Sequence, residues 1–270
     1  MTHRFDHREV CMGTVFRFAG QSPLDSAATE RAVEAACAIL HEADRTFSLY
    51  KPESPLSQLA RGETSVANCP PVVDEIWNEC ERWEKVTDGW FSAFTPEHTF
   101  DPSGVVKTWA AMRAAEHLLE NGIVDFTMNA GGDVWISEAA SEPLDWRIAI
   151  HKPVSIAAED AGLLTVLDLR GTPYRALATS GSAERGLHIW NPKAAGKVAA
   201  NELVQVSVAA RDLVTADVWA TAAFAQGGHA VETMNRYNLA HPDNQVQALF
   251  VWPDGNLTGT DGFVELFAKG

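Results

Sequence analysis

Hydrophobic and polar residues alternate in several short stretches of the chain, and this period of two predicts β-strands. The first such stretch, TVFRFA at residues 14–19, lies near the N-terminus. Further strand candidates lie later in the chain, at residues 124–128, 134–137, 146–151, 162–169, 174–179, 203–209 and 246–252. Most of these segments follow one another with no helical pattern between them.

Apolar residues recur every three to four positions in other segments, and this spacing predicts amphipathic helices. The longest covers residues 26–46, with Asp25 or Ser26 as its N-cap. Further helices are predicted at residues 74–86, 105–120, 215–227 and 229–237, and a loop with turn residues at SLYKPESPLSQL. Because the strands occur in runs separated from the helices, the order favours an α+β fold over a regularly alternating chain. No linker or repeat interrupts the pattern, so we expect one domain over residues 1–270.

The composition is that of a folded protein with a strongly acidic surface. Of 270 residues 46% are hydrophobic and 21% charged, enough to bury a substantial core. The net charge is -15, from 21 basic and 36 acidic residues, and no basic block is present, so no nucleic-acid partner is expected. An anionic small molecule would need local help from a metal ion or from backbone N–H groups.

The N-terminal segment MTHRFDHREVCMGTVFRF carries charges throughout. It lacks the apolar core of about 7–15 residues that a signal peptide needs, and no segment approaches about 18 uninterrupted apolar residues. We therefore expect a cytoplasmic protein without membrane insertion. The four cysteines (Cys11, Cys37, Cys69 and Cys80) are far apart with no C-x-x-C pair, so neither a zinc site nor a redox motif is indicated and they are expected to be reduced and mostly structural.

The segment ATSGSAERGLHIWNP, residues 178–192, is rich in hydroxyl and charged side chains and includes His188. It is compatible with a serine hydrolase site, a polar turn with an incidental histidine, or part of a phosphate-handling site. The hydrolase interpretation fails because the G-x-S-x-G motif is absent. Taken alone, His188 is more often a surface or core histidine than a catalyst.

The segment TADVWATAAF, residues 215–224, begins with Thr215 as the expected N-cap and spaces Asp217 and Thr221 four residues apart, on one helix face. Two oxygen ligands on one face can hold Mg²⁺. The alternative is structural: an acidic residue near the start of a helix complements its positive end.

Two glycine-containing segments lie earlier in the chain than residues 215–224. In DPSGVVKTWAAMRAA, residues 101–115, Lys107 lies in the first turn of a helix, where backbone N–H groups can receive a phosphate, although no Walker A motif is present. In NAGGDVW, residues 129–135, the glycines permit close approach of a flat ligand, or an ordinary hairpin turn.

Taken together and in order, these segments resemble the ApbE family, the FAD:protein FMN transferases. The DPSG-VVK-x-WA pattern followed by NAGGD is most similar to the actinobacterial branch. The matching blocks are CMGTVFRF, RTFSLYKPESPLSQL, TDGWF, DPSGVVKTWAAMRAAEHLLENGIVDFTMNAGGDV, ALATSGSAERGLHIWNP and VSVAARDLVTADVWATAAFAQG.

The resemblance implies a T-fold-related α+β domain of two α/β lobes around a flavin-binding cleft. It also implies a Mg²⁺-dependent reaction in which FAD is split at its pyrophosphate. FMN is attached to a threonine or serine of an acceptor flavoprotein of the FMN-binding-domain type, and AMP leaves.

The resemblance further implies roles for individual residues. His188 matches the catalytic histidine. Asp217 and Thr221 match the metal ligands, with a third ligand supplied by the main-chain carbonyl of Ala110. The positions that match cofactor-binding residues are Met12 and Tyr50 at the flavin, Lys107 and Arg113 near the dinucleotide, and Trp190.

The chain departs from the family pattern at three positions. Where the family has K-G-[YW]-A-x-[DE], this chain has Thr108 in place of glycine and Met112 in place of the carboxylate. Where the family often has G-x-F-D, Phe91 is followed by Ser92. Two alternatives therefore stay open: an FAD pyrophosphatase that releases FMN and AMP when no acceptor is present, and a non-catalytic FAD-binding protein.

Overall fold

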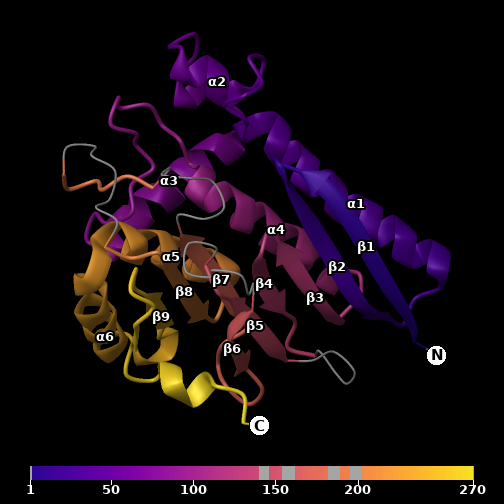
Figure 1. Cartoon of the computed structure of the whole chain (residues 1–270). Coiled ribbons are helices and arrows are strands. Elements are labelled where there is room, and N and C mark those ends of the chain that lie inside the picture. The colour runs from indigo at the N-terminus through magenta and orange to yellow at the C-terminus, as the bar shows by residue number, and fades with distance from the viewer. Residues whose placement is uncertain (1, 140–145, 154–161, 182–188, 195–201, 270) are drawn as a thin grey trace. The chain divides into compact units, whose positions relative to one another are not determined.

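The computed structural model describes residues 2–139, 146–153, 162–181, 189–194 and 202–269 (Figure 1). The chain divides into two compact units, each described separately below. The N-terminal unit consists of Met1–Val86, Ser92–Gly132 and Ile136–Leu144, and the C-terminal unit of Thr87–Phe91, Asp133–Trp135 and Asp145–Gly270.

The N-terminal unit contains three antiparallel strands in the order β1 (His3–Cys11), β2 (Thr14–Ser22) and β3 (Asp125–Ala130). Met12 and Gly13 join β1 to β2, with φ values of 50° and 70°. Positive φ at both central residues is what a two-residue type I′ turn requires, and its twist matches that of the strands. This turn holds the sequence CMGT in a tight hairpin.

The helices of this unit are α1 (Ser26–Phe47), α2 (Pro55–Ala60), α3 (Pro71–Val86) and α4 (Ser103–Glu120). The side chain of Asp25 accepts the N–H of Ala28 at 2.7 Å, so Asp25 is the N-cap of α1. Helix α1 packs along α4 and also contacts β1. The core between these elements is built from fully buried aliphatic and aromatic side chains, among them Phe16, Phe126, Leu40, Ile76 and Leu118.

The C-terminal unit contains five antiparallel strands in the order β4 (Asp133–Ile136), β7 (Ala176–Gly181), β8 (Gln205–Ala210), β9 (Gln247–Val251) and β10 (Leu257–Gly259). Strands β5 (Arg147–His151) and β6 (Leu163–Asp168) form a separate antiparallel pair. Helix α5 (Leu213–Gln226) packs on β7 and β8 and is followed by α6 (Ala230–Ala240). Every residue of β8 is buried, so this strand lies at the centre of the unit's core.

Both units combine antiparallel strands with helices, which confirms the α+β class. Among the described strands and α-helices, three differ from the sequence-based expectation: β1 and β10 are not among the predicted strands, and α2 occupies part of a predicted loop. The helix forms there because Ser54 caps it and Pro55 is its first residue, a favoured start for a helix. In the described part of the chain, no helix is both long and apolar enough to cross a bilayer. The single domain stays a prediction, and so does the cytoplasmic location.

Candidate functional site

In the C-terminal unit, α5 and β7 bring together three side chains that carry oxygen atoms. Asp217 and Thr221 lie one turn apart on α5, as the spacing predicts. The hydroxyl of Thr221 lies 3.3 Å from that of Ser180 on β7. Asp217 is only 6% exposed and Ser180 is also buried. The arrangement therefore places a carboxylate and two hydroxyls along one face of the helix.

The start of α5 differs from the prediction that Thr215 is its N-cap. Asp212 is the N-cap: its Oδ1 accepts the N–H of Thr215 at 2.8 Å, and Thr215 donates its hydroxyl to Oδ2 at 2.6 Å. The helix thus begins earlier, and Asp217 lies in its second turn. Because the helix dipole acts mainly within the first turn, its stabilisation of Asp217 is weaker than the sequence suggested.

Asp133 organises the end of β7. Its Oδ1 accepts the backbone N–H of Thr179 at 3.0 Å, and the hydroxyl of Thr179 lies 2.8 Å from that of Ser207 on β8. At Gly181 a Cβ would lie 2.7 Å from the carbonyl oxygen of Val204, so only glycine allows this close approach of the chains. Asp133 and Ser180 are outside the set of predicted site residues, although both stand in the quoted motifs NAGGD and TSG.

A second group of predicted segments meets in the same unit. Lys193 forms an ion pair with Asp88 at 2.9 Å and lies over the ring of Trp90, 4.7 Å from its centroid. The lysine holds the pKa of Asp88 below its usual value. The TDGWF block thus contacts the chain just after the half-buried Trp190. His188 lies outside the described residues, so its predicted role is not tested.

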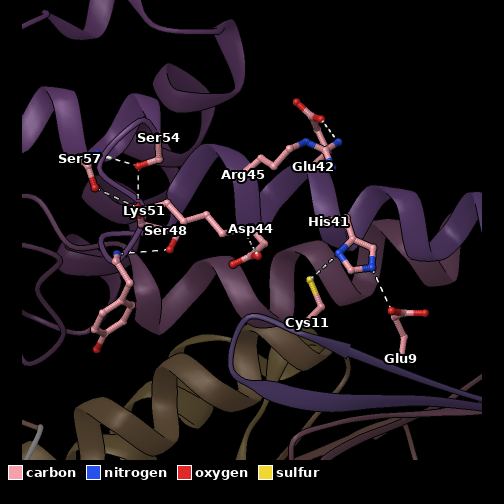
Figure 2. Close-up of polar contacts among 11 residues, drawn as sticks. Glu9, Cys11, His41, Glu42, Asp44, Arg45, Ser48, Lys51, Ser54 and Ser57 are labelled. Carbon is pink, nitrogen blue, oxygen red and sulfur yellow. Dashed lines mark hydrogen bonds and ion pairs between the residues drawn. The ribbon is translucent and has the colours of Figure 1, made fainter.

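In the N-terminal unit, Met12 lies in the β1–β2 turn and Tyr50 in the loop after α1. Tyr50 is 98% exposed, and its backbone N–H donates to the hydroxyl of Ser48 at 3.3 Å. The carbonyl of Ser48 in turn accepts hydrogen bonds from the hydroxyls of Ser54 at 2.6 Å and Ser57 at 3.1 Å (Figure 2). The loop is therefore braced from within while the phenol ring stays available for a ligand.

Three predicted residues lie along α4. Lys107 is half-buried, Ala110 is fully buried and Arg113 is exposed. Arg113 pairs with Glu75 of α3 at 3.3 Å. At 3.6 residues per turn, positions 107 and 113 point about 120° apart, so the two cations are on different sides of the helix.

The substitution at Thr108 is accommodated inside the helix. The side chain is fully buried, and its hydroxyl donates to the carbonyl of Val105 at 3.3 Å. The added polar group is therefore satisfied where the family has a glycine.

The oxygen-donor set fits a hard divalent cation. Mg²⁺ prefers oxygen ligands, and is usually held by one or two carboxylates with water and substrate completing its shell. Asp217 and Thr221 supply such atoms from the C-terminal unit. Ala110 belongs to the N-terminal unit, and the complete set of three ligands stays a prediction.

Comparison with known proteins identifies relatives. The model of the ApbE family matches residues 93–250. The FAD:protein FMN transferase of Escherichia coli K12 is 29% identical over 154 residues, which cover 54% of this chain and 42% of that protein. The FAD:protein FMN transferase of Vibrio cholerae serotype O1 is 29% identical over 152 residues, covering 52% and 43%. The chain thus spans less than half the length of the curated relatives it matches.

Two solved structures are similar over nearly the whole chain. The flavin transferase ApbE from Vibrio cholerae superposes with a TM-score of 0.78 at 20% identity, over 99% of this chain and 100% of that one. The flavinyl transferase ApbE from Pseudomonas stutzeri, in its apo form, gives 0.79 at 19% identity, over 100% and 98%. At these identities the likeness establishes the fold.

Proposed function

Because the chain belongs to the ApbE family, we propose that it is a Mg²⁺-dependent flavin transferase that takes FAD as its substrate. It attaches the FMN part to a threonine or serine of an acceptor flavoprotein. The matched relatives are named FAD:protein FMN transferases, which supports this reaction. The observation that carries the proposal is the oxygen-donor set of Asp217, Thr221 and Ser180, in which Asp217 and Ser180 are buried, inside the region that the family model matches.

The proposed reaction replaces the phosphoanhydride bond of FAD by a phosphoester bond to the acceptor. The acceptor hydroxyl forms a bond to the phosphorus of the FMN part, the pyrophosphate bond to that phosphorus breaks, and AMP leaves with the bonding electron pair. The hydroxyl proton must be removed as the new bond forms. Positioning and charge neutralisation dominate this type of transfer.

Asp217 and Thr221 are the proposed protein ligands of Mg²⁺, with the carbonyl of Ala110 as a third. When bound, the ion neutralises the charge that develops on the diphosphate. Ser180 positions the hydroxyl of Thr221 through their 3.3 Å contact. A locally bound cation also explains how a chain with a net charge of -15 can take an anionic dinucleotide.

His188 is the proposed general base that accepts the proton of the acceptor hydroxyl, because imidazole titrates near neutral pH. Met12, Tyr50 and Trp190 are the proposed contacts of the isoalloxazine ring, since a thioether and aromatic faces suit a flat, polarizable ring. Lys107 and Arg113 are proposed to lie near the phosphates and the adenosine part.

Two alternatives predict different products. An FAD pyrophosphatase would use water in place of the acceptor hydroxyl and release free FMN together with AMP. A non-catalytic FAD-binding protein would release neither. The substitutions at Thr108 and Met112 motivate the second alternative.

One experiment separates the three. The purified protein is incubated with FAD and Mg²⁺, with and without an FMN-binding-domain flavoprotein, and AMP, free FMN and protein-bound flavin are measured. A transferase gives AMP and bound flavin in equal amounts only with the acceptor. Free FMN without the acceptor identifies the hydrolase. FAD binding with no AMP in either reaction rules out both catalytic functions.

A further inference from the structure

Strand β1 and helix α1 carry a cluster of metal-ligating side chains that the proposed transferase reaction does not use. His7 and Glu9 are two residues apart and therefore point to the same face of β1. Cys37 and His41 are four residues apart and share one face of α1. The two elements contact each other. The period of the strand and that of the helix thus bring nitrogen, oxygen and sulfur atoms to one place.

The distances within this cluster suit a single small cation. The ligand atoms of His7, Glu9 and Cys37 all lie within 4.8 Å of one another. Nε2 of His7 is 3.3 Å from Oε2 of Glu9. With Zn–N and Zn–O bonds of about 2.0–2.2 Å and Zn–S of about 2.3 Å, tetrahedral ligands lie roughly 3.3–3.6 Å apart. Small side-chain rotations are enough to converge the three atoms on one ion.

His41 holds the carboxylate of Glu9 in place. Its Nε2 lies 2.9 Å from Oε1 of Glu9, and its Nδ1 lies 3.5 Å from Sγ of Cys11 (Figure 2). Every donor then meets an acceptor if Cys11 donates to Nδ1 and Nε2–H donates to Glu9. A ligating carboxylate is commonly oriented by such a second hydrogen bond.

Cys37 lies at the buried end of the cluster and His7 at its open end. Cys37 is 5% exposed, whereas the side chains of His7 and Glu9 are 38% and 25% exposed. A cation bound here would meet the sulfur of Cys37 at the buried end and would displace the thiol proton. The exposed end gives that cation a path from solvent.

We propose that His7, Glu9 and Cys37 form a binding site for a transition-metal cation of the Zn²⁺ type, with His41 and Cys11 as positioning residues. Mixed sulfur, nitrogen and oxygen donors select such cations, whereas Mg²⁺ takes oxygen donors and prefers the different set on α5. Three protein ligands leave the fourth position to water or a small anion. The bound ion would tie the N-terminal strand to α1, and this proposal is independent of the transferase function.

The test uses untagged, metal-free protein titrated with Co²⁺ and with Zn²⁺. Co²⁺ should bind one per chain, with a thiolate-to-metal absorption band and the strong visible bands of tetrahedral coordination. Zn²⁺ should displace it and raise the melting temperature, because it binds the folded state. Cys37→Ser should abolish the thiolate band. His7→Ala should weaken Zn²⁺ binding by at least about a hundredfold, since even residues behind the ligands commonly cost about 10–100-fold.

Two matched variants serve as controls. Cys80 is also buried in the N-terminal unit but lies on α3, outside the cluster, so Cys80→Ser should keep the thiolate band. Asp217→Ala should also keep it, because its carboxylate belongs to the proposed Mg²⁺ site.

Three outcomes would overturn the proposal: no thiolate band at one equivalent of Co²⁺, an unchanged band in Cys37→Ser, or loss of the band in Asp217→Ala. If Cys37→Ser fails to fold, the His7→Ala variant tests the proposal instead, because His7 is partly exposed and its removal should cost the fold little. Folded His7→Ala that binds Zn²⁺ as tightly as the wild type also refutes the site.

Discussion

Asp217 is almost completely buried and lies one helical turn from Thr221, whose hydroxyl contacts that of Ser180. Carboxylates are seldom buried unless they are paired or bind a cation. At the residue scale, the proposed role of Asp217 as a metal ligand is therefore tested by removing its carboxylate.

We expect Asp217→Ala to lower AMP release at millimolar Mg²⁺ by at least about a hundredfold, because only neutral oxygens would remain to hold the ion. The fold should survive, with a loss of stability in the ordinary range of about 0.5–3 kcal/mol. Higher Mg²⁺ or Mn²⁺ should restore part of the activity. Asp243→Ala, which removes an exposed carboxylate of the same unit, is the control. Metal-response curves of Asp217→Ala that coincide with those of the wild type would leave the carboxylate without a role in catalysis.

His188→Ala should slow flavin transfer by about 10²–10⁴-fold, the usual contribution of a general base, while FAD and Mg²⁺ binding stay nearly intact. The measurement is single-turnover transfer to the acceptor, with FAD affinity followed in parallel. His229→Ala, at an exposed position, is the matched control. A variant that melts normally and transfers flavin at the wild-type rate would remove His188 from the mechanism.

Tyr50→Ala should weaken FAD binding several-fold without changing the melting temperature. The ring is almost fully exposed, so its removal costs the fold little, while an aromatic face lost from a flavin contact is worth about 0.5–1.5 kcal/mol. Leu239→Ala, which removes another highly exposed apolar side chain, is the control. Equal FAD affinities in a fluorescence titration of Tyr50→Ala and the wild type would exclude Tyr50 as a ring contact.

At the scale of the element, the hydrogen bonds at the N-terminus of α5 determine where this helix begins. Asp212 accepts both the N–H and the hydroxyl of Thr215, so one side chain fixes the first turn of the helix that carries Asp217 and Thr221. The same helix packs on β7, so its register also determines how Thr221 meets Ser180.

Asp212→Ala should lower the free energy of unfolding by about 0.5–2 kcal/mol, the usual cost of losing an N-cap. Asp212→Asn, which keeps an acceptor oxygen, should restore most of it. Urea denaturation of the three proteins measures the difference. An unchanged midpoint in Asp212→Ala would mean that packing alone fixes the start of α5.

The elements that could be predicted from the sequence are those whose pattern is carried by hydrophobic residues. The predicted bounds of helices α1 and α4 and of strands β8 and β9 agree with the structure within a few residues. The buried faces of the two helices repeat with the helix period, whereas β8 and β9 are buried along their whole length and correspond to short, mostly apolar runs. Strand β1 was not predicted, because charged or imidazole side chains occupy both of its faces. It is an edge strand, and such strands often carry charges.

In the candidate site, too, contacts set by local spacing could be predicted, whereas contacts between distant segments could not. The sequence could predict that Asp217 and Thr221 lie close together, because residues four positions apart share one face of a helix. Ser180 could not be assigned to them, since its contact with Thr221 joins residues 41 positions apart. Cys37 lies 28 positions from Glu9, and no local spacing reveals that these two proposed ligands meet. Contacts of this kind follow from the packing of elements, not from their individual periods.

At the scale of the whole molecule, the net charge affects how an anionic substrate approaches the protein, whereas the family match concerns the fold. A net charge of -15 disfavours approach of an anion over long range, while a bound cation acts at the point of reaction. The expected absence of a nucleic-acid partner rests on the same charge and stays a prediction. The family match and the whole-chain structural similarity establish the ApbE fold, and the actinobacterial branch stays a prediction.

The division into two units also sets an order of events on the ribosome. All residues of the N-terminal unit have been synthesised once Leu144 is added, yet Thr87–Phe91 and Asp133–Trp135 within that stretch belong to the C-terminal unit. Asp133 accepts the N–H of Thr179, which is synthesised 46 residues later. At about 5–20 residues per second, this interval is roughly 2–9 s. During it, the nascent chain carries the carboxylate that will organise the end of β7 before that strand exists.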